Sequence, residues 1–185
     1  MASLGPLLAT LQPWQNFYML TGAAAATLTG LMFVAVTFGS SLVTKETTAT
    51  TRAFLDPIYA HFVQVLVTSC LLTVPTLQAS FLGGALLTLA GVRLSRLFWV
   101  FRRYQEAQRK HGDIELSDWF LSIVIPLLCY VLLLGTGIGF IVGAPAALTG
   151  LAIVTLTLLF IGVHGAWELF VWMAVAVSER RRSGP

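Results

Sequence analysis

The sequence predicts an all-α membrane protein, a bundle of five transmembrane helices in a single domain. Of its 185 residues, 57% are hydrophobic and only 10% are charged, whereas soluble domains carry about 25% charged residues. Its apolar runs are comparable in length to the roughly 20 residues that a helix needs to cross a bilayer. Most charges lie between these runs or after the last one. We expect an integral membrane protein, located in a bacterial cytoplasmic (inner) membrane.

The bounds of the expected segments follow from these runs. We expect a basic cytoplasmic loop over about 102–118 and a charged tail over about 178–185. The five spans are expected at about 17–43, 57–74, 81–101, 119–142 and 146–177.

The first span contains a ridge of small residues. Gly22, Ala26 and Gly30 recur every four residues, and small side chains at this spacing let a second helix approach closely. That second helix belongs either to the same chain or to another copy, and the spacing favours neither.

The second span is expected to begin at Asp56-Pro57, because aspartate caps the free amides of a helix start and proline suits the first helical position. Pro75 is expected to end it. His61, Gln64 and Thr68 stand at i, i+3 and i+7. The spacing predicts a polar stripe on one side of an otherwise apolar helix.

The third span takes in two arginines, Arg93 and Arg96, before its apolar run ends, and we expect the helix to continue beyond the membrane. Basic residues near the ends of the spans are expected to face anionic lipid headgroups. They are Arg102, Arg103, Arg109, Lys110, Arg180, Arg181 and Arg182.

The fourth span carries a second ridge of small residues. Gly135, Gly139 and Gly143 again recur every four residues, a spacing typical of close helix packing. Pro126 is expected to bend the helix, and Ala144-Pro145 to turn the chain into the fifth span.

The fifth span contains two ionisable residues, His164 and Glu168, which stand four apart and therefore share one helix face. An ionisable residue inside a membrane span is costly and usually faces the protein interior or a water-filled cavity. This pair is the strongest candidate for a functional feature.

The distribution of basic residues predicts the orientation. All eleven Lys and Arg residues fall in or beside the first loop, the third loop and the C-terminal tail. The segments that alternate with these carry none, so the positive-inside rule predicts an outside N-terminus and a cytoplasmic C-terminus.

Polar residues of three spans are expected at similar depth in the cytoplasmic half of the bilayer, at about 1.5 Å of rise per residue. We expect Arg93 and Glu168 to pair, because each charge alone carries a desolvation cost. The set lines a pocket or a proton or ion pathway, or else it holds helices together. Its members are His61, Gln64, Thr68, Arg93, His164 and Glu168.

The leading functional hypothesis is a small homo-oligomeric channel or permeation protein, because five helices are few to enclose a path alone. One alternative is a non-catalytic accessory or scaffold subunit of a larger membrane complex. Another is a haem- or quinone-binding anchor, with His61 and His164 as axial haem ligands. Catalytic motifs and metal-ligand spacings are absent from the sequence, so we expect no enzyme activity, metal or cofactor. Topology accounts for the positive charge, so we expect no nucleic-acid partner.

Overall fold

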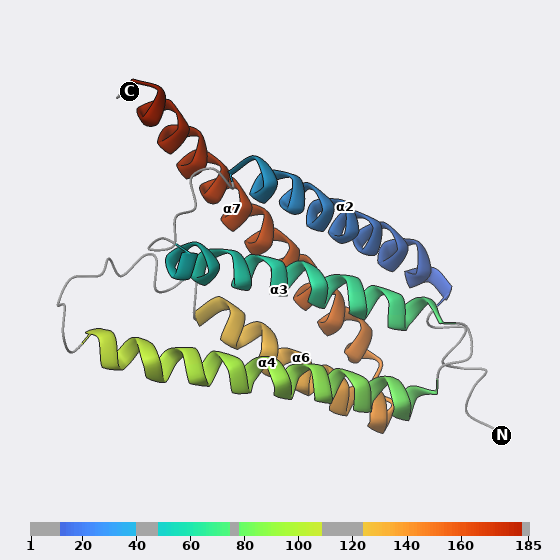
Figure 1. Cartoon of the computed structure of the whole chain (residues 1–185). Helices are drawn as coiled ribbons and strands as arrows, with labels where there is room; N and C mark the ends of the chain where they lie inside the picture. Colours follow the sequence, from blue (N-terminus) through green and yellow to red (C-terminus); the bar gives the residue numbers. More distant parts are fainter. Residues whose placement is uncertain (1–11, 40–47, 75–77, 109–123, 183–185) are drawn as a thin grey trace. The chain divides into compact units, whose positions relative to one another are not determined.

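The computed structural model describes residues 12–39, 48–74, 78–108 and 124–182, and every described element is helical. Five helices are long and apolar enough to cross a membrane, which makes the chain an integral membrane protein by length and composition. Figure 1 shows these elements in chain order. They are η1 (Gln12–Trp14), α2 (Gln15–Gly39), α3 (Thr48–Thr73), α4 (Ala79–Gln108), α6 (Ile125–Val142) and α7 (Ala146–Arg182).

The start of α3 differs from the prediction at Asp56-Pro57. The helix begins at Thr48, and Pro57 lies inside it. A proline within a helix removes one backbone hydrogen bond, but membrane helices tolerate this where neighbouring groups satisfy the freed carbonyl. The apolar part of α3 still begins close to the predicted point, at Leu55.

The other helix ends refine the predicted spans. Pro126 falls in the first turn of α6 as described. Residues 119–123 of the predicted span lie outside the described residues, so the predicted bend at Pro126 stays a prediction. At the C-terminus, α7 continues as helix through Arg182 and includes most of the predicted tail.

The chain divides into two compact units. Unit 1 comprises residues 1–15 and 71–157, and therefore α4, α6 and the first part of α7. Unit 2 comprises residues 16–70 and 158–185, and therefore α2, most of α3 and the rest of α7.

In unit 1, α4 and α6 pack antiparallel at glycines. A Cβ atom on Gly83 would lie 2.6 Å from the carbonyl oxygen of Gly137, and one on Gly137 would lie 2.9 Å from Leu87. Only glycine permits this approach. Gly143 ends α6 in the left-handed conformation at φ 75°, which glycine adopts without steric cost, and the chain turns into α7.

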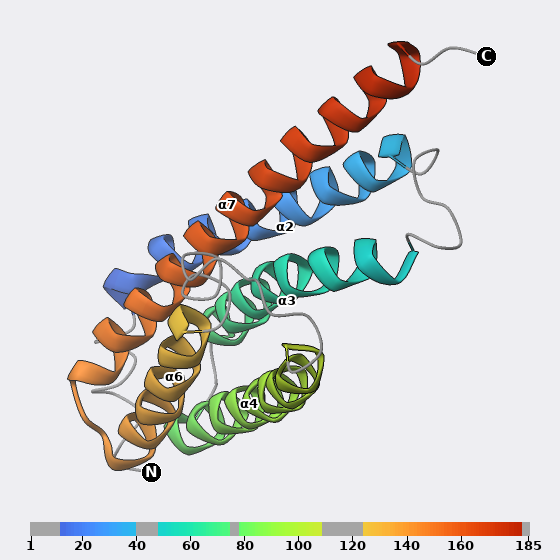
Figure 2. The ribbon, with the colours of Figure 1, turned by 90° about the vertical axis from the view of Figure 1, so that its left-hand side faces the viewer.

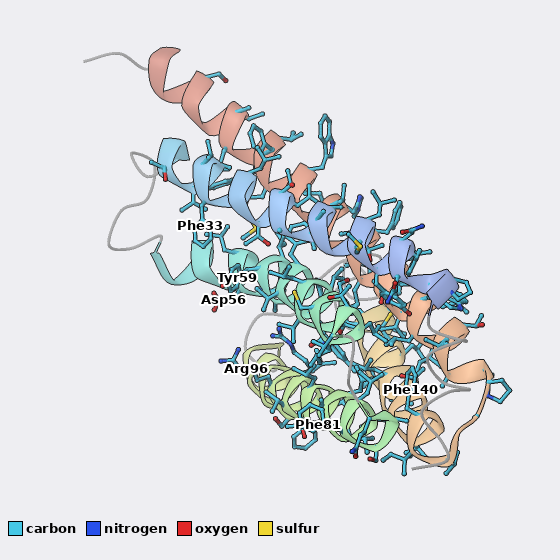
Figure 3. The ribbon with its side chains drawn as sticks, turned by 90° about the vertical axis from the view of Figure 1, so that its right-hand side faces the viewer. Phe33, Asp56, Tyr59, Phe81, Arg96 and Phe140 are labelled. Atoms are coloured by element: carbon cyan, nitrogen blue, oxygen red, sulfur yellow. The ribbon has the colours of Figure 1, made fainter. Side chains whose placement is uncertain are left out.

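In unit 2, α2, α3 and the C-terminal part of α7 run alongside one another (Figure 2). The fully buried ring of Phe62 from α3 fills the space beside Gly162 of α7, where an added Cβ would lie 2.6 Å from the ring. Figure 3 shows Phe33 of α2 directed toward Tyr59 of α3, and their ring centroids are 6.1 Å apart.

Candidate functional site

The polar stripe of α3 is buried in unit 2. The side chains of His61, Gln64 and Thr68 are all below 9% exposed, although the helix that carries them is mostly apolar. Two further buried polar residues belong to the same unit, Thr21 of α2 and Ser69 of α3. We call these five residues the polar seam.

Hydrogen bonds connect members of the polar seam. The hydroxyl oxygens of Thr21 and Ser69 lie 3.2 Å apart and join α2 to α3. The Gln64 amide donates to the hydroxyl of Thr68 at 3.4 Å. Within the described part of the chain, no buried side-chain nitrogen or oxygen lacks a hydrogen-bond partner. The seam is therefore satisfied by protein groups, as buried polar atoms in an apolar environment must be.

Sequence patterns did not predict a role for Thr21 or Ser69, although Gly22 of the predicted small-residue ridge lies beside both. Thr21 precedes Gly22, and a Cβ added at Gly22 would lie 2.8 Å from the Cβ of Ser69. The glycine lets α2 approach α3 closely enough for the two hydroxyls to meet. A hydroxyl beside a small-residue position is the signal that would have found this contact.

The two ionisable residues of α7 do meet, as their spacing predicts. The Nε2 atom of His164 and the Oε1 atom of Glu168 are 3.1 Å apart, and the two side chains are 45% and 66% exposed. Their neighbours Val163, Trp167 and Val171 are exposed as well. The pair was expected to face a protein interior or a cavity; in the structure it lies on an exposed, apolar face of a membrane-length helix.

Contacts between α3 and α7 show which part of α3 lies beside His164 and Glu168. Gly162 packs against Phe62 and Gly165 against Ile58, so the backbone of His164 is level with the α3 segment that holds His61. The two histidines are thus at similar positions along the packed helices but in different surroundings. His61 is buried, whereas His164 is exposed and in contact with Glu168, so their geometry gives no support to a shared haem.

Glu168 lies near the end of the apolar layer of unit 2. Its neighbour Leu169 packs in one cluster with Ile58 and Phe62, and Leu55, the first residue of the apolar part of α3, borders that cluster. Glu168 is therefore close to the height at which α3 becomes apolar, and His164 lies about one turn, or about 6 Å, further in.

Arg93 belongs to unit 1 and is partly buried in α4. It interacts electrostatically with the phenol of Tyr130 in α6. Glu168 belongs to unit 2, so the expected pair between Arg93 and Glu168 stays a prediction.

Some positions of the two predicted small-residue ridges make close contacts within the chain, and others do not. Gly22 and Gly139 make close intrachain contacts, to Ser69 and to Ala147. Gly30 and Gly135 face open space, and Ala26 is exposed. Gly143 caps α6 and has no atom near its Cβ position. A close approach of two helix backbones occurs at Gly83 and Gly137, which belong to neither ridge.

The predicted lipid-facing basic residues lie mainly at helix ends. Arg102 and Arg103 are in the last two turns of α4, and Arg180 to Arg182 close α7, while Arg109 and Lys110 lie outside the described residues. Among the described residues, no group of three or more His, Cys, Asp or Glu side chains is placed to hold a metal ion.

Comparisons with protein-family models, with curated proteins and with solved structures found no match to this chain. Functional inference therefore rests on the two features described above: the buried polar seam and the exposed pair of His164 and Glu168.

Proposed function

We propose that this protein is a small homo-oligomeric channel or permeation protein of the bacterial cytoplasmic membrane. Its subunits would meet at the face of α7 that carries His164 and Glu168. Polar groups from this face would then line the path at its cytoplasmic end. The proposal keeps the predicted orientation, with the N-terminus outside.

One observation carries the proposal. His164 and Glu168 are 45% and 66% exposed on a helix whose surrounding exposed residues, such as Val163 and Trp167, are apolar. Ionisable groups that face hydrocarbon cost several kcal/mol, on the order of 2.5–3.5 kcal/mol for one charge at the centre of a membrane helix. A second subunit or a water-filled path on this face would remove that cost.

The test is ion flux through purified protein in liposomes. We expect flux of at least one of K⁺, Na⁺, H⁺ or Cl⁻ from the wild-type protein, and a change of several-fold in Glu168→Gln and His164→Ala. Glu179→Gln is the matched control, because it removes the same charge from α7 beyond its apolar part. The proposal fails if the wild type conducts none of these ions, or if Glu179→Gln changes flux as much as Glu168→Gln does.

A second candidate function is a non-catalytic accessory or scaffold subunit of a larger membrane complex. Hydrogen bonds within the chain already satisfy the polar seam, and this favours a structural role for its buried polar groups. A photo-crosslinker at position 164 distinguishes the candidates in the native membrane. Crosslinking to a second copy supports the homo-oligomer, whereas crosslinking to a different protein, together with absent flux, supports the accessory subunit.

A further inference from the structure

Two arginines of unit 1 lie inside the apolar part of α4. Arg93 and Arg96 stand three residues apart, so they are neighbours on the helix surface. Arg93 is partly buried and interacts electrostatically with Tyr130. Arg96 is exposed, and Figure 3 shows its side chain extending outward from α4.

The packing of α4 against α6 gives the depth of Arg96. Gly83 contacts Ile141, Leu87 contacts Gly137, and Arg93 interacts with Tyr130. As the residue number rises along α4 it falls along α6, so Arg96 is level with the first turn of α6, at 125–128. The apolar part of α6 begins in that same turn.

The length of α4 gives the same depth. Its apolar part runs from Ala79 to Phe98, which at about 1.5 Å per residue spans about 30 Å, the thickness of the hydrocarbon core. Arg96 is then about 3 Å, and Arg93 about 8 Å, inside the far boundary of that core. Arginine side chains at such depth extend toward the phosphate layer.

The described part of unit 1 offers no carboxylate at the depth of Arg96. Within the described residues of this unit the sole carboxylate belongs to Glu106, which lies about 15 Å further along α4. The phosphate of a lipid headgroup is the anion at the right height, and guanidinium groups bind phosphate through paired hydrogen bonds.

The exposed face of α4 continues from Arg96 into the apolar layer. Val92 and Thr88 precede Arg96 by one and two turns, and both are exposed. They form an uncharged strip along which an acyl chain can lie while its headgroup reaches the guanidinium.

We propose that Arg96, with Arg93 beside it, binds the phosphate of an anionic phospholipid at the end of the α4–α6 pair that the positive-inside rule predicts to be cytoplasmic. Arg96 makes the principal phosphate contact. Arg93 adds positive charge one turn deeper. This site is independent of the proposed permeation function, because it lies in unit 1 and uses neither His164 nor Glu168.

The test is lipid retention measured by native mass spectrometry on purified full-length protein with phosphatidylglycerol and phosphatidylcholine. We expect the wild type to retain phosphatidylglycerol preferentially, and Arg96→Gln to weaken retention about tenfold. Arg96→Lys should fall between them, because it keeps the charge and loses the paired hydrogen bonds. Arg180→Gln is the control that removes the same charge at the end of α7.

Three outcomes would overturn the proposal. The first is equal retention of the two lipids by the wild type. The second is an equal loss in Arg96→Gln and Arg180→Gln, which would indicate diffuse attraction to basic residues. The third is displacement of phosphatidylglycerol by millimolar inorganic phosphate, which would indicate a site for free phosphate. Circular dichroism of each variant confirms that a loss of lipid does not reflect unfolding.

Discussion

Unit 1 and unit 2 hold their helices together by different means, although both are built from apolar membrane-length helices. In unit 1, α4 and α6 meet backbone to backbone at Gly83 and Gly137. In unit 2, the ring of Phe62 fills the space beside Gly162, and Thr21 and Ser69 join α2 to α3 through their hydroxyls. Unit 1 relies on close contact of small residues, and unit 2 combines a large buried ring with a polar seam.

The lipid solvent limits the attractions that are available to both units. Lipid chains are as apolar as leucine, so the hydrophobic effect does not press helices together inside a bilayer. Close van der Waals contact and interhelical hydrogen bonds remain as sources of attraction, and the two units use them in different proportion. Three experiments test this difference between the two units.

The largest effect is expected in unit 2, from Phe62→Ala. Phe62 is fully buried, and removing such a ring leaves a cavity that typically costs about 3–5 kcal/mol. The free energy of unfolding, measured by denaturant titration in mixed micelles, should fall by this amount. Phe160→Ala is the control, because Phe160 is 72% exposed, and it should change stability by less than about 0.5 kcal/mol. Similar losses in the two variants would mean that Phe62 does not anchor the packing of α7 on α3.

The next effect is expected in unit 1, from Gly83→Ala. The new Cβ would lie 2.6 Å from the backbone oxygen of Gly137, and a helix backbone cannot move aside as a side chain can. Overpacking of this kind typically costs about 1–3 kcal/mol. Gly84→Ala is the control at the next position, where no atom lies within 4 Å. It should leave stability unchanged or raise it, since alanine favours helix over glycine by about 0.5–1 kcal/mol. If both variants have equal stability in the same micelle titration, α4 and α6 do not pack at Gly83.

Sequence patterns predicted what depends on spacing along one helix. The five apolar helices follow from the length of the apolar runs, and the structure contains them. The shared face of His164 and Glu168 and the stripe formed by His61, Gln64 and Thr68 follow from the 3.6-residue period, and the structure contains both. These features need no information about a partner helix.

Features that depend on a second helix were harder to predict. Gly135 and Gly137 are two residues apart and look alike in sequence, yet Gly137 contacts Leu87 and Gly135 faces open space. The same limit applies to His164 and Glu168, whose spacing gives a shared face and not the direction in which that face points. The prediction at Pro57 was wrong for a different reason. Asp56-Pro57 predicted a helix start, but the residues before it are also helical, so Pro57 lies inside α3.

The smallest effect is expected from the bond between Thr21 and Ser69, whose oxygens are 3.2 Å apart. A double-mutant cycle with Thr21→Val and Ser69→Ala measures it cleanly. Ser69→Ala keeps the Cβ atom that packs beside Gly22, and Thr21→Val keeps the side-chain shape. Thr21 also donates to the carbonyl oxygen of Phe17 at 3.0 Å, but that loss occurs with or without Ser69 and cancels in the cycle.

We expect a coupling energy of about 0.6 kcal/mol, the average for hydrogen bonds between membrane helices, and not above about 1.7 kcal/mol. The measurement is again the free energy of unfolding in micelles, for the wild type, both single variants and the double variant. A coupling near zero would mean that the hydroxyl contact adds nothing to the close approach that Gly22 allows. Unit 2 would then be held, like unit 1, by packing alone, and the distinction between the two units would reduce to the size of the side chain that fills each gap.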